Sequence, residues 1–164
     1  MTKVAVVFAE GFEEIEALSP VDVFRRAGFD CSMLGLESAS VTGSHGIQVA
    51  MDGVFDGNFA DYDLVVLPGG MPGSTNLRDN QDLIAPIVLE RAGLLEGRKF
   101  TCFPGVEDQI ASGEHQTDLV VVDGNIVTSR GAGTVLAFAY ALVDLLGGDG
   151  QQLAHTMVYD RLFQ

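Results

Sequence analysis

The chain of 164 residues has the size of one ordinary domain, and its 47% hydrophobic content is enough to bury a full core. Its formal net charge is −14, which argues against binding a nucleic-acid backbone, because that requires clustered Lys and Arg. No apolar run approaches the roughly 20 residues of a membrane span. The sequence enters a strand directly, without a signal pattern, so we expect a cytoplasmic protein.

Strands and helices are predicted to alternate along the chain. A short apolar run rich in β-branched residues predicts a strand buried on both faces at 3–8. Further strands are predicted at 29–36, at 62–70, where the strand runs into a glycine turn, and at 99–103. Hairpins are predicted at 40–53, with its tip at 43–46, and at 118–129, around the turn Asp123–Gly124. Helices are predicted at 13–28 and from about Thr134 to Leu146.

The first helix carries two specific expectations. Ile15, Leu18 and Val21 recur at helical spacing, which predicts that they face the core. Pro20 is expected to end or kink the helix near its middle, because proline lacks the N–H of the helical ladder.

The alternation predicts one α/β domain over residues 1–164, with a parallel sheet covered by helices on both faces. In such sheets the working site lies outside the carboxyl ends of the strands. Three stretches leave strands at that edge: "FAEGFEEIE", "LPGGMPGS" and "TSRGAGT".

Glycines and a glutamate at this edge could serve a reaction. Gly69, Gly70 and Gly73 let backbone N–H groups approach a ligand, as an oxyanion hole requires; the alternative is a tight strand-to-helix turn. Glu13, Glu14 and Glu16 suit the first turn of a helix through its dipole. A carboxyl held near the buried side of a strand end would, however, tend to be protonated and could donate a hydrogen bond. Glu16 is the candidate.

The stretch "NQDLIAPIVLERAG", residues 80–93, breaks the alternation. One amphipathic segment ends at Leu83 and Ile84, and another opens at Pro86. A strand should separate two helices in this kind of chain, and none is present.

Three segments, "VVFAEGFEEIEALSPVDVFRRAG", "YDLVVLPGGMPGSTNLRDN" and "VTSRGAGTVLAFAYALVDLLGG", resemble the DJ/ThiJ/PfpI superfamily in the family's order. The resemblance implies a flavodoxin-like, doubly wound, mostly parallel sheet of the class I glutamine amidotransferase type, in a homodimer. It implies a cysteine nucleophile on a strained turn and glyoxalase III or protein deglycase activity on methylglyoxal and its adducts, with a stress-protective role. Some relatives are hydrolases or chaperones.

The resemblance assigns roles to individual residues. Glu16 falls on the glutamate that supports the nucleophilic sulfur, and Gly69 and Gly70 fall on the amides that face the reacting carbonyl oxygen. Arg26 and His45 fall near positions that supply cations from across the dimer in some relatives, and Arg130 begins a loop beside the site. Neither a metal nor a cofactor is implied.

This sequence departs from the family between Ala85 and Pro86. Relatives carry there a helix end, a central strand and the turn that bears the nucleophilic cysteine. We therefore expect Ala85 and Pro86 to be neighbours in numbering only. Cys31 and Cys102 show no metal-ligand spacing, and neither is predicted to lie on a strained turn that would activate it.

Three functions remain open. The natural protein is a family cysteine enzyme whose nucleophile segment this sequence lacks, or it is an inactive family member acting as a chaperone or binding module, or it is an amidotransferase-like hydrolase. The third requires a Cys–His pair, and His115 and His155 lie outside any family-like catalytic context. We favour the first, because removing a central strand should cost more than the roughly 5–15 kcal/mol by which domains are stable.

Overall fold

A four-stranded parallel sheet forms the centre of the computed structural model, which describes residues 1–79, 90 and 93–163. Its strands are β1 (Lys3–Phe8), β2 (Asp30–Gly35), β5 (Gly53–Val54) and β6 (Leu64–Val66), in the order β5-β2-β1-β6. β1 pairs in parallel with both β2 and β6, with Val4 opposite Cys31 and Leu64. The predicted α/β fold with a mostly parallel sheet is therefore confirmed.

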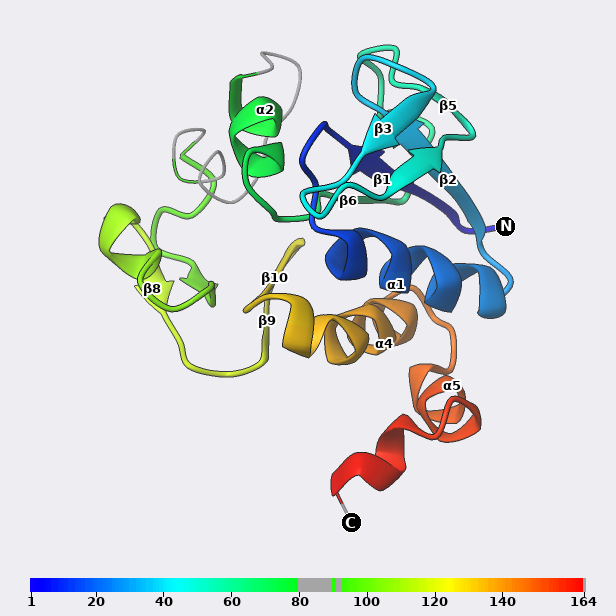
Figure 1. Ribbon diagram of the computed structural model, residues 1–164. Coiled ribbons are helices and arrows are strands. Elements are labelled where there is room, and N and C mark those ends of the chain that lie inside the picture. Colours follow the sequence, from blue (N-terminus) through cyan, green and yellow to red (C-terminus); the bar gives the residue numbers. More distant parts are fainter. Residues whose placement is uncertain (80–89, 91–92, 164) are drawn as a thin grey trace.

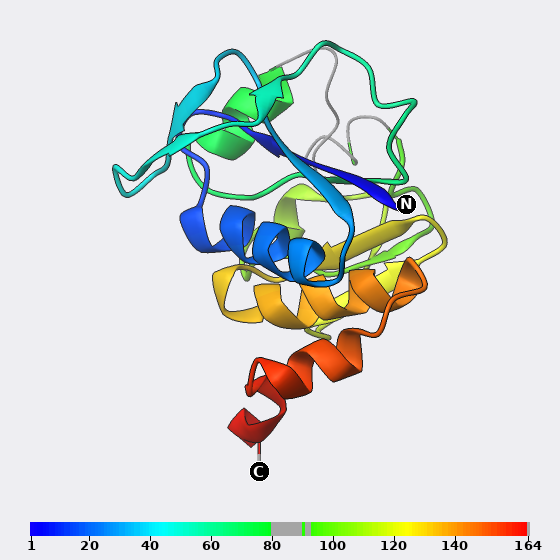
Figure 2. The same cartoon turned by 90° about the vertical axis from the view of Figure 1, so that its right-hand side faces the viewer.

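Helices cover both faces of this sheet (Figures 1 and 2). Alternate residues of a strand point to opposite faces, and β1 shows this directly. Val4, Val6 and Phe8 pack into one core with helices α1 (Glu14–Arg26) and α4 (Val135–Leu145). Val7 packs into a second core with Leu77 of helix α2 (Gly73–Asp79).

Two expectations concern helix α1. It continues through Pro20 to Arg26, so the helix does not end at this proline, and a kink there stays a prediction. Pro20 and Val21 are both buried, and burial against the rest of the core compensates for the hydrogen bond that proline cannot make. Ile15 is 54% exposed and does not face the core as predicted. Glu14 and Ala17 are buried there instead, which rotates the buried face by about one residue.

Both predicted hairpins are present as antiparallel pairs. The first joins β3 (Ser40–Thr42) to β4 (Gln48–Ala50), and the second joins β9 (Val120–Asp123) to β10 (Ile126–Ser129). Between them lies a parallel pair, β7 (Lys99–Phe100) with β8 (Glu114–His115), of which β8 was not predicted. Short helices that the sequence did not indicate complete the described chain: η1 (Glu107–Gln109), η2 (Ala132–Thr134), α5 (Gly150–Thr156) and η3 (Tyr159–Phe163). None of the helices described is long and apolar enough to cross a membrane.

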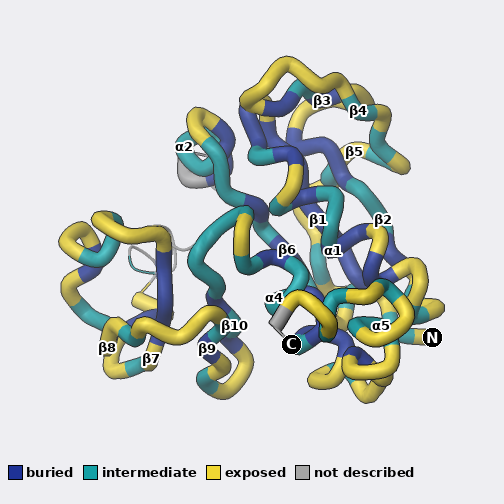
Figure 3. Tube along the Cα trace, turned by 60° about the horizontal axis from the view of Figure 1, so that its bottom comes forward, coloured by how far each residue is buried: buried dark blue, intermediate teal, exposed yellow. Residues whose placement is uncertain are grey.

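The four-stranded sheet stops at β6. Among the described strands, β6 pairs only with β1, while β7 and β8 form a separate sheet. Leu64 and Val65 of β6 are only partly buried, whereas every residue from Val4 to Phe8 in β1 is fully buried (Figure 3). β6 is therefore an edge in the described sheet. The junction of Ala85 and Pro86, and the separation expected there, lie outside the described residues.

Candidate functional site

The loop after β1 and the turn after β6 are joined by backbone hydrogen bonds at the carboxyl edge of the sheet. The N–H of Glu13 donates to the carbonyl of Gly69 at 2.9 Å, and the N–H of Gly73 donates to the carbonyl of Gly11 at 3.0 Å. The Asn76 side-chain amide adds a bond to the carbonyl of Glu10 at 2.7 Å. These contacts fix the start of α1 against the "PGG" turn.

Glu16 lies in this junction, as the sequence predicts. The Gly69 N–H donates to Glu16 Oε2 at 2.8 Å. Burial raises the pKa of Glu16, and the charge of Glu13 adds to this, while hydrogen bonds from the backbone N–H groups of Gly69 and Ala132 work in the opposite direction. The expectation of a raised pKa at Glu16 is confirmed, and the carboxyl remains protonated over a wider pH range than an exposed glutamate.

Two glycines lie close to the Glu16 carboxyl. A Cβ on Gly69 would lie 2.4 Å from Glu16 Oε2, so any side chain there would force the carboxyl group to move. A Cβ on Gly131 would lie 3.5 Å from Glu16 Oε1 and 3.2 Å from the ring of Phe103. Three loops, after β1, β6 and β10, therefore converge on one carboxyl group.

The backbone N–H groups of the two "PGG" glycines differ in their hydrogen bonding. The Gly69 N–H is bonded to Glu16, so in this conformation it is not free for a substrate oxygen. Gly70 has φ +97°, and a Cβ there would lie 2.4 Å from the backbone nitrogen of Glu13. No described residue accepts a hydrogen bond from the Gly70 N–H, which leaves this amide available as an oxyanion donor. The oxyanion roles of both glycines stay predictions.

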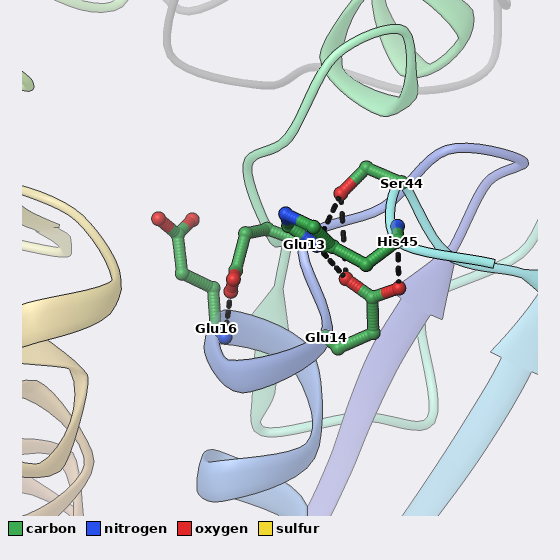
Figure 4. A network of polar contacts seen from close by, with 5 residues as sticks. All are labelled: Glu13, Glu14, Glu16, Ser44 and His45. Atoms are coloured by element: carbon green, nitrogen blue, oxygen red, sulfur yellow. Dashed lines mark hydrogen bonds and ion pairs between the residues drawn. The ribbon is translucent and has the colours of Figure 1, made fainter. Parts of the chain in front are cut away.

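Glu13 and Glu14 lie at the start of α1 and have different hydrogen-bond partners (Figure 4). Glu13 caps the helix, because its Oε2 accepts from the Glu16 N–H at 2.7 Å. Glu14 points to the opposite side, toward the β3–β4 hairpin. Its carboxylate accepts from the His45 N–H at 2.8 Å, contacts His45 Nδ1 at 2.7 Å and accepts from the Ser44 hydroxyl at 3.3 Å.

The Glu14–His45 pair perturbs both partners. Burial works to raise the pKa of Glu14, but the hydrogen bonds from the side chain and backbone of His45 outweigh it and lower the pKa to about 2. The hydrogen bond to Glu14 and its charge raise the pKa of His45. The imidazole is 70% exposed while the carboxylate is buried, so the pair places the imidazole at the solvent face of the hairpin.

The two predicted arginines lie elsewhere. Arg26 is in the last turn of α1, ten residues after Glu16 and therefore about 15 Å along the helix, and its Nε donates to Asp22 Oδ2 at 2.8 Å. It does not approach the Glu16 carboxyl of its own chain. Arg130 leads into the loop beside Glu16, but its Nη1 donates to the carbonyl of Thr117 at 3.0 Å.

Neither thiol is an activated nucleophile. Burial raises the pKa of Cys31 to about 11. Burial and the carboxylate of Glu107 also raise the pKa of Cys102. A reactive cysteine requires the opposite shift, because the thiolate is the nucleophile. The described part of the chain thus holds the supporting glutamate and glycines without a thiolate beside them.

One group of side chains was missed by the sequence reasoning. Ligand atoms of Cys102, Glu107 and His115 all lie within 4.8 Å of one another. Their spacing along the chain carries no recognisable motif, and β8, which positions His115, is only two residues long. No signal in the sequence could have brought these three side chains together.

Comparisons with known proteins relate this geometry to a family. The model of the "DJ-1/PfpI family" matches the chain in two pieces, residues 2–85 and 84–145. The chain is 34% identical to the Parkinson disease protein 7 homolog of Danio rerio, over 87% of this chain and 88% of that one. It is 34% identical to a deglycase of Pyrococcus horikoshii, over 88% of this chain and 99% of that one. It spans only 38% of the length of the DJ-1 homolog B of Arabidopsis thaliana, at 33% identity over 89% of this chain.

Solved structures agree. A cysteine-to-alanine mutant of a DJ-1 superfamily protein from Salmonella typhimurium superposes with a TM-score of 0.89 at 34% identity, covering 96% of this chain and 98% of that one. Drosophila melanogaster DJ-1beta superposes with a TM-score of 0.89 at 30% identity, covering 96% and 97%.

The same comparisons reveal a discontinuity. The alignment with the P. horikoshii deglycase is 164 positions long. It includes only 88% of the present chain, which is about 144 of its 164 residues. About 20 positions of the relative therefore face no residue here. The two matches to the family model meet at residues 84–85, beside the junction of Ala85 and Pro86 at which a missing strand is predicted.

Proposed function

The chain belongs to the DJ-1/PfpI family, and we propose that the natural protein is a cysteine-dependent enzyme of the glyoxalase III and protein deglycase type. Its substrates are small reactive aldehydes such as methylglyoxal, or their glycated adducts. The nucleophilic cysteine lies in a segment that the natural polypeptide carries between Ala85 and Pro86. One observation carries the proposal: the Glu16 carboxyl, with its raised pKa, is held by the Gly69 amide at the carboxyl edge of the sheet.

The geometry suits attack by a thiolate on a carbonyl carbon. A protonated Glu16 donates a hydrogen bond to an adjacent sulfur, which favours the thiolate over the thiol. The thiolate forms a C–S bond to the aldehyde carbon, and the carbonyl π electrons move to its oxygen. The Gly70 N–H, which no described residue engages, then stabilises the developing oxyanion.

Three observations support the missing segment. The described sheet ends at β6, where Leu64 and Val65 remain partly exposed. The family model matches in two pieces that meet at residues 84–85. About 20 positions of a deglycase relative have no counterpart in this chain, which is enough for a strand, a turn and a helix end.

The mass of the intact protein, purified from its natural source, tests the segment directly. We expect a mass above the 17.4 kDa of the 164-residue chain, and peptide sequencing should find the extra residues between Ala85 and Pro86. A mass of 17.4 kDa would reject the enzyme and leave a family member without its nucleophile, acting as a chaperone or binding module.

A methylglyoxal-to-lactate assay and release of adducts from a glycated peptide test the chemistry on the natural polypeptide. Replacing the segment's cysteine by serine should abolish turnover, and Glu16→Gln should lower kcat by tenfold or more. Cys31→Ser is the matched control, since its thiol is buried in strand β2 with a pKa of about 11; it should retain activity. Unchanged turnover in the first two variants would remove both roles.

We also propose that the protein is a homodimer joined through α1 and the β3–β4 hairpin. The exposed imidazole of His45, with its pKa raised by Glu14, offers a cationic group on that hairpin for a site in the second copy. Size-exclusion chromatography with light scattering at micromolar concentration should give twice the chain mass. A monomer under these conditions would contradict the proposal.

A further inference from the structure

Cys102, Glu107 and His115 form a compact group that does not include Glu16, on the segments from β7 to β8. Cys102 follows strand β7, Glu107 begins helix η1, and His115 ends strand β8. One sulfur, one carboxylate oxygen and one ring nitrogen lie within 4.8 Å of one another. The sulfur belongs to a buried residue and the imidazole to an exposed one, so the group opens toward solvent on one side.

Local contacts position His115 and Glu107. Parallel pairing sets Phe100 opposite His115, and the N–H of Gln116 donates to the carbonyl of Phe100 at 2.7 Å. The Phe100 and His115 rings lie with their centroids 5.5 Å apart, which limits rotation of the imidazole. Glu107 Oε2 accepts from the Gly105 N–H at 2.6 Å, which orients the carboxylate toward Cys102.

We propose that Cys102, Glu107 and His115 bind a divalent borderline-soft cation, with Zn²⁺ as the best match, and that a solvent molecule completes a tetrahedral site. Tetrahedral zinc has bonds of about 2.3 Å to sulfur and about 2.1 Å to oxygen, which places those two ligands about 3.6 Å apart. The Cys102 Sγ to Glu107 Oε2 distance is 3.9 Å. A small side-chain adjustment therefore closes the site.

The donor set selects the class of metal. Sulfur and imidazole favour Zn²⁺ and similar ions, whereas Mg²⁺ and Ca²⁺ prefer sites made entirely of oxygen. Binding replaces the thiol proton, which leaves to solvent as the sulfur–metal bond forms. Three protein ligands with solvent at the fourth position match the pattern of catalytic zinc sites, whereas structural zinc sites have four protein ligands.

A second group, Glu13, Glu14 and His45, also lies within 4.8 Å but is a weaker candidate. Its Glu14 carboxylate is already engaged by the backbone and ring of His45 and by Ser44, and it offers no sulfur. The two groups share no residue, so substitution of one histidine at a time distinguishes them.

The test is titration of the purified, chelator-treated full chain with Zn²⁺, followed by calorimetry, and with Co²⁺, followed by absorption. We expect one ion per chain and a thiolate-to-cobalt charge-transfer band. Cys102→Ser and His115→Gln should each weaken Zn²⁺ binding at least tenfold, and Cys102→Ser should remove the band. Cys31→Ser and His155→Gln are matched controls, because Cys31 lies in β2 and His155 is paired with Asp160; both should bind as the parent does.

Several results would overturn the site. The first is that the chain binds no Zn²⁺ at a hundredfold molar excess. The second is that both Cys102→Ser and His115→Gln still bind Zn²⁺ as the parent does. The third is that His45→Gln loses Zn²⁺ binding while His115→Gln keeps it. His115 is exposed, so His115→Gln should keep the fold, and circular dichroism of the metal-free variants verifies this. The measurement reads metal binding rather than turnover, so its outcome does not depend on the proposed enzyme activity.

Discussion

Substituting Gly69 with alanine should disrupt the junction that holds Glu16. The new Cβ would lie 2.4 Å from Glu16 Oε2 and 3.3 Å from its carboxyl carbon, against 3.4 Å or more in an ordinary contact. The carboxylate must retreat by about 1 Å, which overstretches its 2.8 Å bond from the Gly69 N–H. Overpacking of this kind costs about 1–3 kcal/mol, and a lost hydrogen bond costs about 0.5–1.5 kcal/mol.

Alanine also restricts the unfolded chain, which stabilises by about 0.4–1 kcal/mol. The net expectation for Gly69→Ala is therefore a loss of about 0.5–4 kcal/mol in the free energy of unfolding, combining the packing and hydrogen-bond costs with that gain. Gly133→Ala is the matched control, because a Cβ at Gly133 meets no heavy atom within 4 Å and its φ is not left-handed. This control should be neutral or slightly stabilising.

Urea unfolding of both variants, in the parent and in a Glu16→Ala background, measures the effect and assigns its cause. If the clash is with Glu16, Gly69→Ala should cost little once that carboxylate is removed, giving a coupling energy of about 1 kcal/mol or more. An equal cost in both backgrounds would refute the reasoning. So would a Gly69→Ala variant as stable as Gly133→Ala.

Two further predictions concern pH. Because the folded-state pKa of Glu16 is raised, the folded protein holds the Glu16 proton more tightly than the unfolded chain does, and stability falls as pH rises from the unfolded pKa of about 4.3 through the folded value. The stability of Glu16→Gln relative to the parent should therefore rise across that pH window and then level off. A stability difference that is constant with pH would exclude the raised pKa. The pKa of Glu14 is lowered to about 2 and the pKa of His45 is raised, so their interaction should stabilise the fold most between about pH 5 and 6, where both groups are largely charged even in the unfolded chain. The stability advantage of the parent over His45→Gln should decline toward pH 2 as Glu14 protonates, and at higher pH as His45 deprotonates. A stability difference that does not change with pH would show that the pair contributes nothing.

Local patterns in the sequence predicted much of the fold. The apolar run at 3–8 became β1, with buried residues on both faces. The Asp123–Gly124 turn predicted the β9–β10 hairpin, in which Gly124 has φ +60°. These features follow from residues adjacent in the chain, where turn preference and hydrophobic periodicity act directly.

Tertiary packing decided what local patterns did not. Ile15 fits the apolar periodicity of α1, yet it is exposed, and the charged Glu14 is buried in its place. Burial of Glu14 depends on donors from Ser44 and His45, about thirty residues away, and periodicity cannot register such partners. Likewise, the grouping of Cys102 with His115 depends on the two-residue strand β8, which is too short to produce a pattern.

The candidate site was predictable because its residues occupy the ends of parallel strands. β1 and β6 are neighbours in the sheet, so the loops that follow them must meet at one edge. The predicted sheet edge and the family resemblance together placed Glu16 near the Gly69 amide. The sequence could not predict that the Gly69 N–H donates its hydrogen bond to Glu16, because that bond depends on the rotamer of the Glu16 side chain.

The edge at β6 links the fold to the proposed activity. Among the described strands, β6 pairs only with the fully buried β1, and its Leu64 and Val65 are partly exposed. Native sheets avoid edges that present unpaired backbone groups and an apolar surface. Filling that edge with one further parallel strand would bury these residues and pair the backbone. Because parallel strands end at the same edge, the turn after such a strand would emerge beside Glu16 and the Gly70 amide. The element that completes the sheet would thus also bring the nucleophile to the site, and stability and activity would depend on the same segment.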